Sequence, residues 1–323
     1  MRNHPGNHLE FHPNVEGSAI ACIGLSRSYG EVQALKNLNL TVPYGSIFGF
    51  LGRNGAGKTT TIRLLTGLAK PSSGSAWVAG VEATRADSAA RQRFGYLPQA
   101  PAFYRWMTPA EYLDYVARLF NLPQKERKQR IAEVLQLVDL KSAARRKIGG
   151  FSGGMVQRLG IAQAMIHHPQ VLFLDEPTSA LDPAGRYEVL ELIESLRGEV
   201  TVFFSTHILS DVERVCDAVA IIHKGELLLQ SSREALVNKY PVNTAELELD
   251  NHGQANGKWT EILQQQPWVN AIKTENNIVR IMVTDLAQGK QALLPLVAGL
   301  GLIINRIQWV HPTLEDIFLE VSA

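Results

Sequence analysis

Cysteine is scarce in this chain of 323 residues, since Cys22 and Cys216 are its only two and lie far apart without metal-type spacing. They indicate reduced, buried thiols in a cytosolic protein rather than a disulfide framework or a zinc site. Surplus charge is also missing, because 32 basic and 31 acidic residues leave a formal net charge of +1. Composition therefore gives no general electrostatic case for nucleic acid or anionic lipid as the main partner.

A hydrophobic run long enough to cross a membrane is missing as well. The longest candidate, QALLPLVAGLGLIIN at 291–305, lies between Lys290 and Arg306 and contains Pro295. It falls short of the roughly 18–20 apolar residues that a spanning helix needs, so we expect a helix, a glycine turn and a strand. The N-terminus lacks a charged start followed by an apolar core, and no signal peptide is expected.

Residues 1–17 are expected to form a flexible N-terminal tail. His4, His8 and His12 recur at a spacing that would place them on one face of a helix. Pro5 and Pro13 disfavour a continuous helix there, so a flexible tail is preferred over a metal site.

Short apolar runs alternate with helical patterns between residues 18 and 239. SIFGFL, VLFLDE and VTVFFSTH are continuously hydrophobic, as are strands of a parallel sheet covered on both faces. Patterns such as TTTIRLLTGLA and GRYEVLELIESLR lie between them and predict helices, which together give an α/β domain with a mixed sheet. AVAIIHKGELLLQS predicts a hairpin that turns at Lys224 and Gly225. The interval from about 83 to 166 has helical periodicity and few strand signals, so a helical insert is expected there.

A second, smaller domain is expected from residue 240 to residue 323. Its first part contains a proline, the alternating strand AELELD and a polar loop rich in Gly and Asn. The following patterns predict the order strand, helix, strand, strand, helix, strand, with a last helix at TLEDIFLEV. This is the split arrangement of ferredoxin-like α+β folds.

A phosphate-binding motif, G-x-x-x-x-G-K-[ST], occupies residues 52–59, between the strand SIFGFL and a helical pattern. Gly55 and Gly57 permit a tight turn that points backbone N–H groups inward, and the helix that begins near Lys58 adds its positive end. Lys58 can reach the β- and γ-phosphates, and the hydroxyl of Thr59 can bind Mg²⁺. The residues expected to hold the nucleotide here are Gly52, Arg53, Asn54, Gly55, Ala56, Gly57, Lys58, Thr59 and Thr60.

Two of the hydrophobic runs end in polar residues: VLFLDE ends in Asp175 and Glu176, and VTVFFSTH ends in His207. Asp175 and Glu176 stand at the carboxyl end of a strand, where α/β sheets bind their ligands. Asp175 can hold Mg²⁺ through water, and Glu176 is placed to orient and deprotonate the water that attacks a phosphoryl group. His207 could hydrogen-bond the γ-phosphate, although alone it could also be a strand-end histidine without a role. The expected catalytic residues are Glu176, His207 and Lys58.

The stretch FSGGMVQRLGIAQAM at 151–165 is the most informative. Ser152, Gly153 and Gly154 open a helix, which makes a second cluster of N–H groups at a positive helix end. Together with GRNGAGKT and VLFLDE, this stretch makes the chain resemble the ATP-binding subunits of ABC transporters over roughly residues 20–230. Met155 stands where many members have Gln, while the serine and glycines that meet phosphate are retained.

The resemblance implies roles for Gln99, Asp182 and Tyr29 and adds to the case for His207. Gln99 in YLPQ matches the glutamine loop, which contacts Mg²⁺ and links it to the helical insert. Asp182 in SALD belongs to the D-loop, His207 is the switch histidine, and Tyr29 is the aromatic residue that stacks on adenine.

The resemblance also implies partners and a location. Two ATP-binding subunits, copies of this chain in the simplest case, would pack head to tail, so that each FSGG helix closes over the partner's ATP. Integral membrane permease subunits would receive the resulting movement, nucleic acid would not be a partner, and the chain would be cytoplasmic and peripheral on the inner face of the membrane.

The C-terminal pattern TLEDIFLEV resembles that of subunits from drug-resistance and antibiotic-export systems, which implies an efflux permease. Relatives in that group also serve other exports and cofactor assembly. The alternatives are an ABC ATPase of DNA repair or translation, the ATPase of a cofactor-assembly system, and a small-molecule kinase. An ABC ATPase of DNA repair or translation typically carries a long coiled coil, zinc-binding cysteines or two ATPase units in one chain, and the sequence shows none of these. A small-molecule kinase would not need the FSGG motif.

Overall fold

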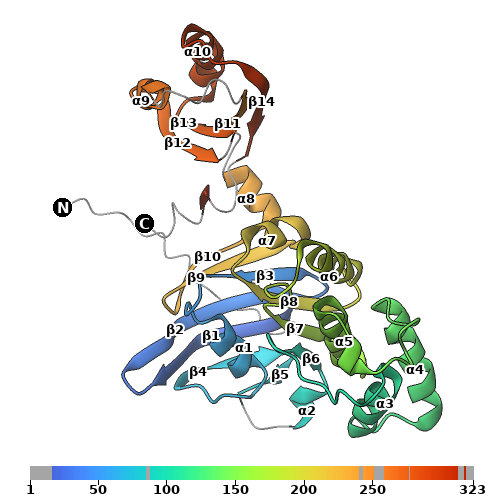
Figure 1. The fold of residues 1–323 in the computed structure, drawn as a ribbon. Coiled ribbons are helices and arrows are strands. Elements are labelled where there is room, and N and C mark those ends of the chain that lie inside the picture. Colours follow the sequence, from blue (N-terminus) through green and yellow to red (C-terminus); the bar gives the residue numbers. More distant parts are fainter. Residues whose placement is uncertain are drawn as a thin grey trace. The chain divides into compact units, whose positions relative to one another are not determined.

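The computed structural model describes residues 17–84, 88–239, 243–250, 258–275, 277–311 and 316–317. His4, His8 and His12 of the expected tail lie outside these residues, and so does most of the expected last helix. The chain divides into two compact units, Met1–Arg233 and Glu234–Ala323 (Figure 1). Each unit has a hydrophobic core of its own.

A six-stranded sheet forms the centre of the first unit. Its order is β10 (Glu226–Ser232), β9 (Ala218–His223), β3 (Ile47–Leu51), β8 (Thr201–Thr206), β7 (Val171–Asp175) and β6 (Phe94–Leu97). The strands from β9 to β6 are parallel, whereas β10 is antiparallel to β9. β3, β7 and β8 are buried along their whole length, as their continuous apolar runs predict. Their carboxyl ends therefore meet at one edge of the sheet.

A second, antiparallel sheet in this unit is not predicted by the sequence patterns. Its order is β2 (Val32–Pro43), β1 (Ser18–Tyr29), β4 (Ser73–Val78) and β5 (Val81–Glu82). Leu25, Leu40 and Val78 from this sheet share one core with Phe48 of β3 and Ile62. Ile62 belongs to α1 (Lys58–Leu65), which contacts strands of both sheets. The helix that follows the phosphate loop is therefore held by two layers.

The other helices of the first unit include those of the expected insert. They are α2 (Ser88–Arg91), α3 (Pro109–Leu119), α4 (Gln124–Leu137), α5 (Gly153–Met165), α6 (Pro183–Ser195) and α7 (Leu209–Val215), with a 3₁₀ turn at Ile148–Gly150. Thr108 and Glu111 form a capping box that fixes the start of α3.

The expected insert needs one correction, because β6 lies within it and belongs to the main sheet. FGYL is a strand of four residues without alternating polarity, so periodicity gives no signal for it. A Cβ at Gly95 would lie 2.0 Å from the carbonyl oxygen of Ala164. Glycine therefore permits the close approach of this strand to α5.

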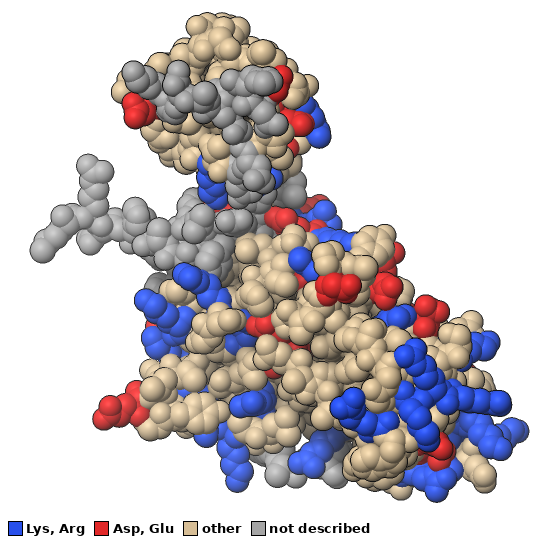
Figure 2. Space-filling view, in the orientation of Figure 1, with Lys and Arg blue, Asp and Glu red and all other residues tan. Residues whose placement is uncertain are grey.

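Positive charge is unevenly distributed despite the near-neutral total. Figure 2 shows Lys and Arg side chains gathered over the region of α3 and α4 in the first unit. Exposed cations in this region include Lys125, Lys128, Lys141, Arg145 and Lys147. The helical insert thus presents a basic face that the net charge does not reveal.

The second unit begins within α8 (Arg233–Lys239), and its described residues also include a four-stranded antiparallel sheet and two further helices. The strand order is β12 (Val269–Glu275), β13 (Ile278–Val283), β11 (Thr244–Leu249) and β14 (Ile304–Val310), and the helices are α9 (Lys258–Gln264) and α10 (Leu286–Gly299). Each edge strand pairs with the strand from the other half, which is the predicted ferredoxin-like arrangement. The apolar run at 291–305 divides into helix, turn and strand as expected, with Gly301 at φ 72°.

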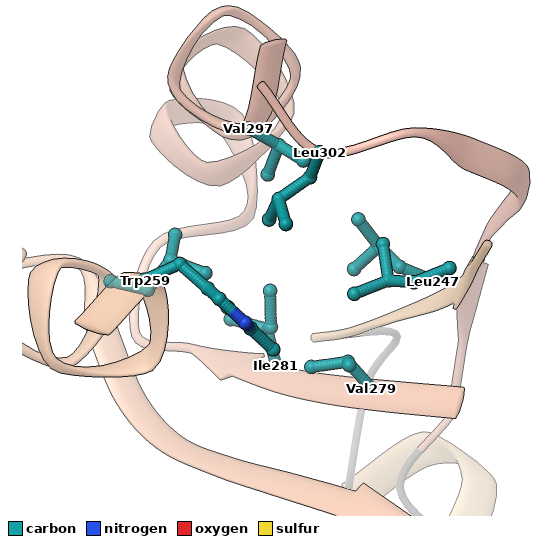
Figure 3. A pocket seen from close by; sticks show the side chains of 8 residues that line it. Leu247, Trp259, Val279, Ile281, Val297 and Leu302 are labelled. Carbon is teal, nitrogen blue, oxygen red and sulfur yellow. The ribbon is translucent and has the colours of Figure 1, made fainter. Parts of the chain in front are cut away.

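The core of the second unit lies between its sheet and its helices. Leu247, Val279 and Ile281 project from β11 and β13 toward Trp259 of α9 and Val297 of α10 (Figure 3). The apolar space between them is too small for a water molecule. Asp316, from the TLEDIFLEV pattern, is also buried and pairs with Lys273 of β12.

Adjacent leucines on α10 provide a test of this core. Leu293 is fully buried, whereas Leu294 is 48% exposed. Leu293→Ala should lower the free energy of unfolding of the second unit by about 2–5 kcal/mol, because it removes contacts and leaves a cavity. Leu294→Ala, the matched control, should change it by less than about 0.5 kcal/mol. Denaturant unfolding followed by tryptophan fluorescence measures both, and equal losses would contradict the packing described.

Candidate active site

A pocket of about 490 Å³ lies at the phosphate loop. The sequence predicts all of its lining residues except Ala34, and these residues are Tyr29, Ala34, Asn54, Gly55, Gly57, Lys58, Thr59, Thr60, Gln99 and Glu176. They come from the ends of β1, β6 and β7, from β2, and from the phosphate loop and the start of α1. Segments far apart in the sequence therefore converge on one cavity.

The phosphate loop requires glycine at two positions for steric reasons. Gly57, the N-cap of α1, has φ 113°, and a Cβ there would lie 2.8 Å from the carbonyl oxygen of Ala34. A Cβ at Gly52 would lie 2.6 Å from the carbonyl oxygen of Ile222. Ala56 is buried behind the loop, where its carbonyl oxygen accepts from the Gly225 N–H. The loop is thus fixed tightly against β2 and β9, and the N-terminus of α1 opens toward the pocket.

Lys58 is nearly buried, with 5% of its side chain exposed. Its Nζ donates to the carbonyl oxygen of Gly52 at 2.7 Å and, with a longer bond of 3.4 Å, to that of Arg53. Nζ also lies 3.0 Å from Oε1 of Glu176. The pairing compensates the cost of burying both charges and places an ammonium beside the loop amides, where an anion would bind.

Asp175, Thr59 and Ser205 form a hydrogen-bonded group of oxygens beside the loop. Thr59 Oγ1 and Ser205 Oγ lie 3.2 Å and 2.7 Å from Oδ1 of Asp175. Asp175 is 1% exposed. Carboxylate and hydroxyl oxygens are the hard ligands that Mg²⁺ prefers, so the residues present fit that ion.

Glu176 has an unusual backbone conformation for a residue with a side chain, at φ 49°. Such strain is concentrated at functional sites. Its Oε2 lies 2.9 Å from Nδ1 of His207, so the carboxylate lies between that ring and the Lys58 ammonium. Only 8% of the Glu176 side chain is exposed, compared with 40% for His207. The arrangement holds a carboxylate at the pocket wall and leaves the imidazole accessible.

Tyr29 ends β1 and stands at the rim of the pocket with 43% of its surface exposed. The guanidinium of Arg27 lies 4.4 Å from its ring centroid, and Arg27 Nη1 donates to the carbonyl oxygen of Lys70 at 2.8 Å. The cation fixes one face of the ring, so an exposed aromatic surface remains available for stacking.

The residues of the FSGG and SALD motifs form a separate cluster. Ser152 caps α5 by accepting from the Met155 N–H at 3.3 Å, and Asp182 caps α6 by accepting from the Gly185 N–H at 3.1 Å. A Cβ at Gly154 would lie 3.6 Å from Cα of Gly185, so the two helix starts are close together. Among the residues that the structure describes, Ser152, Gly153, Gly154 and Asp182 do not line the pocket of Lys58.

Two residues of the site were not identified from the sequence. Ala34 lies opposite Gly57, and no pattern marks it. Ser205 bonds to Asp175 and also accepts from the Glu176 N–H at 3.2 Å. A serine within the buried run VTVFFST is a usable signal, because a polar side chain buried beside an acid needs a partner.

The two cysteines are both free and buried, as the sequence predicts. Burial raises the pKa of the Cys22 thiol to about 12 and also raises the pKa of Cys216. Neither thiol is therefore reactive at neutral pH.

Comparisons with known proteins identify two matching families. The ABC transporter family matches residues 35–179, and the family of DrrA1-3-like ATP-binding protein C-terminal domains matches residues 232–322. YxlF of Bacillus subtilis (strain 168), an uncharacterized ABC transporter ATP-binding protein, is 40% identical over 92% of this chain and 97% of its own length. The bacitracin transport ATP-binding protein BcrA of Bacillus licheniformis is 38% identical over 92% and 95%.

Solved structures include similar folds. cbiO1 from Clostridium perfringens, part of the ABC transporter complex cbiONQ, has a TM-score of 0.63 and 27% identity over 69% of this chain and 92% of its own. Within the described part of this chain, no helix is both long and apolar enough to cross a membrane.

Proposed function

This chain belongs to the ATP-binding subunits of ABC transporters, and on that premise we propose that it powers an exporter by hydrolysing ATP in the pocket of Lys58 and Glu176. As a member of this family it is an ATP-hydrolysing subunit that works with membrane permease subunits. Lys58 and Glu176 line one pocket, and His207 contacts Glu176 at 2.9 Å; this arrangement is the observation that supports the proposed site.

ATP would bind with its phosphates on the loop and its base at Tyr29. The Lys58 ammonium and the N–H groups of residues 54–60 would neutralise phosphate charge at the start of α1. The exposed face of Tyr29 would stack on adenine, which is worth about 1–3 kcal/mol and does not depend on the base. Gln99 lines the same pocket and is the candidate link to the helical insert.

Hydrolysis would depend on Glu176 and His207. Glu176 would accept the proton of the attacking water as that oxygen forms its bond to the terminal phosphorus and the bond to ADP breaks. Because a carboxylate can only accept, Nδ1 of His207 donates to Glu176 and fixes its orientation, and Nε2 would donate to a terminal phosphate oxygen in the imidazolium form of the ring.

Mg²⁺ would be held by Thr59 and Asp175, with Gln99 nearby. When bound, the ion would neutralise part of the charge of the phosphates. In this proposal Ser205 holds Asp175 in place through its bond of 2.7 Å.

A second ATP-binding subunit would complete the site, and a copy of this chain is the simplest candidate. Ser152, Gly153 and Gly154 offer an anion-binding helix start that lies outside the pocket of their own chain. A head-to-tail pair would bring this start to the terminal phosphate of the partner's ATP. ATP would then favour the closed pair through its higher affinity for that state.

The cargo is suggested by the relatives. BcrA is named as a bacitracin transport ATP-binding protein. The linearmycin resistance protein LnrL and the daunorubicin resistance protein DrrA3 match 93% and 95% of this chain. We propose export of an antibiotic-type compound from a position on the inner face of the cell membrane, without nucleic acid as a partner. The DNA-repair, translation and cofactor-assembly alternatives are not favoured by these relatives.

Purification of the tagged full-length chain from its own membranes tests this proposal. We expect an integral membrane protein to co-purify, and vesicles of the complex to move a compound outward only when ATP and active Glu176 are present. Recovery with ribosomes or DNA, and without a membrane partner, would contradict it.

A further inference from the structure

Asp211, in the first turn of α7, is a fully buried carboxylate that takes no part in the chemistry described above. Each of its two carboxylate oxygens accepts a short hydrogen bond. Oδ2 accepts from Thr178 Oγ1 at 2.6 Å, and Oδ1 accepts from Arg186 Nε at 2.6 Å. Charge-assisted bonds of this length are strong, so the three side chains form one rigid unit.

The three residues come from segments that carry the proposed chemistry. Thr178 is 1% exposed and follows two residues after Glu176. Asp211 follows four residues after His207. The contact between Glu176 and His207 joins these two segments at one point, and the bond between Thr178 and Asp211 joins them at a second point.

Arg186 extends the unit to a third segment. It lies on α6, beside α7 in Figure 1, and its Nη2 also donates to Ser210 Oγ at 2.7 Å. The first turn of α6 carries Gly185, which approaches Gly154 of the FSGG helix. The same carboxylate therefore connects the loops of Glu176 and His207 with the helix that contacts α5.

Stability alone is a poor explanation for this arrangement. Burying an ion pair costs desolvation energy, and an apolar replacement of similar size is often equally stable. A buried charge with directional bonds does fix the relative positions of the segments that it joins. Glu176 needs such support, because its φ of 49° must be maintained by its surroundings.

We propose that Asp211 is a positioning residue, which acts through Thr178 and Arg186 to hold Glu176 and His207 in register for hydrolysis. This inference rests on the proposed function. Asp211 itself would touch neither ATP nor water. Loosening the unit should therefore slow turnover and leave ATP affinity unchanged.

Thr178→Val tests the proposal, because valine has nearly the shape of threonine and lacks the hydroxyl that donates to Asp211. In the full-length chain we expect kcat to fall by roughly tenfold to hundredfold, as small misplacements of catalytic groups do, while the Kd for ATP changes by less than about twofold. Thr178→Ser, which keeps the hydroxyl, should recover most of kcat.

Thr201→Val is the matched control. Thr201 is also 1% exposed, and its Oγ1 accepts from the Gly45 N–H at 2.9 Å at the opposite end of β8. The Thr201→Val variant should have a lower Tm and an unchanged kcat. Combined with His207→Ala, Thr178→Val should cost much less than it does alone, since both would act through the placement of Glu176.

Two results separate the possible failures. Full kcat in Thr178→Val, or full additivity with His207→Ala, in a chain that hydrolyses ATP would overturn the positioning role and leave the proposed function intact. A wild-type complex without ATP turnover would overturn the proposed function and the positioning role together.

Discussion

Glu176→Gln should lower ATP turnover by about 10²–10⁴-fold and leave ATP bound. The amide keeps the size of the carboxylate and can still accept from Lys58 or His207, but it cannot take a proton from water. Because hydrolysis would release the closed pair, this variant should also accumulate as an ATP-bound dimer. Phosphate release measures turnover, and size-exclusion chromatography with ATP measures the dimer.

Glu191→Gln is the matched control for this substitution. Glu191 lies on α6 and pairs with Arg214 at 2.6 Å, and 52% of its side chain is exposed. Its variant should hydrolyse ATP at the normal rate, since exposed pairs contribute little. Turnover in Glu176→Gln close to that of the control would exclude Glu176 as the base.

Lys58→Ala should weaken ATP binding by roughly 10- to 100-fold. Lys58 lines the pocket, and its ammonium would donate a charge-assisted hydrogen bond to phosphate. Such a bond contributes about 1.5–3 kcal/mol. The variant also leaves Glu176 without its cation, so Tm should be recorded alongside the Kd from calorimetry or a fluorescent ATP analogue.

Lys125→Ala provides the comparison for Lys58→Ala. Lys125 is an exposed lysine on α4, outside the pocket. Its removal deletes the same charge without touching the site, so ATP affinity should remain normal. Unchanged affinity in Lys58→Ala, with a folded protein by Tm, would refute the assignment of the phosphate loop.

The sequence predicted β3, β7 and β8 of the parallel core and the strand and helix order of the second unit from β11 to β14, because their signals are local. The continuous runs of β3, β7 and β8 and the amphipathic patterns of α3 and α4 are each readable without knowledge of their neighbours. The antiparallel sheet of β1, β2 and β4 was not predicted. The pairing of β1 with β4 joins residues distant in sequence, such as Ile20 with Val78, and leaves no short-range pattern. The pairing of β1 with β2 is a local hairpin with Tyr29 opposite Val32, and it was not identified from the sequence.

Site residues could be predicted where the chemistry requires them at fixed intervals in the sequence. They could not be predicted where the fold alone brings two distant residues into contact. The loop from Gly52 to Thr59 must have its glycines, lysine and threonine at fixed intervals to surround phosphate. Asp211 carries no such constraint. Its role depends on the folding of α6 and α7 together, and only the structure brings it to Thr178 and Arg186.

The central claim is that the ATP site of one chain is completed by Ser152 of another. Cross-linking tests it directly, because the native thiols are buried and unreactive. One tagged copy carries Ser152→Cys and a second copy carries Asn54→Cys, both with Glu176→Gln to retain ATP. The account predicts an ATP-dependent disulfide between the two copies in the mixture and none in either copy alone. A mixture that stays monomeric with saturating ATP, while a single chain carrying both cysteines closes an internal disulfide, would contradict it.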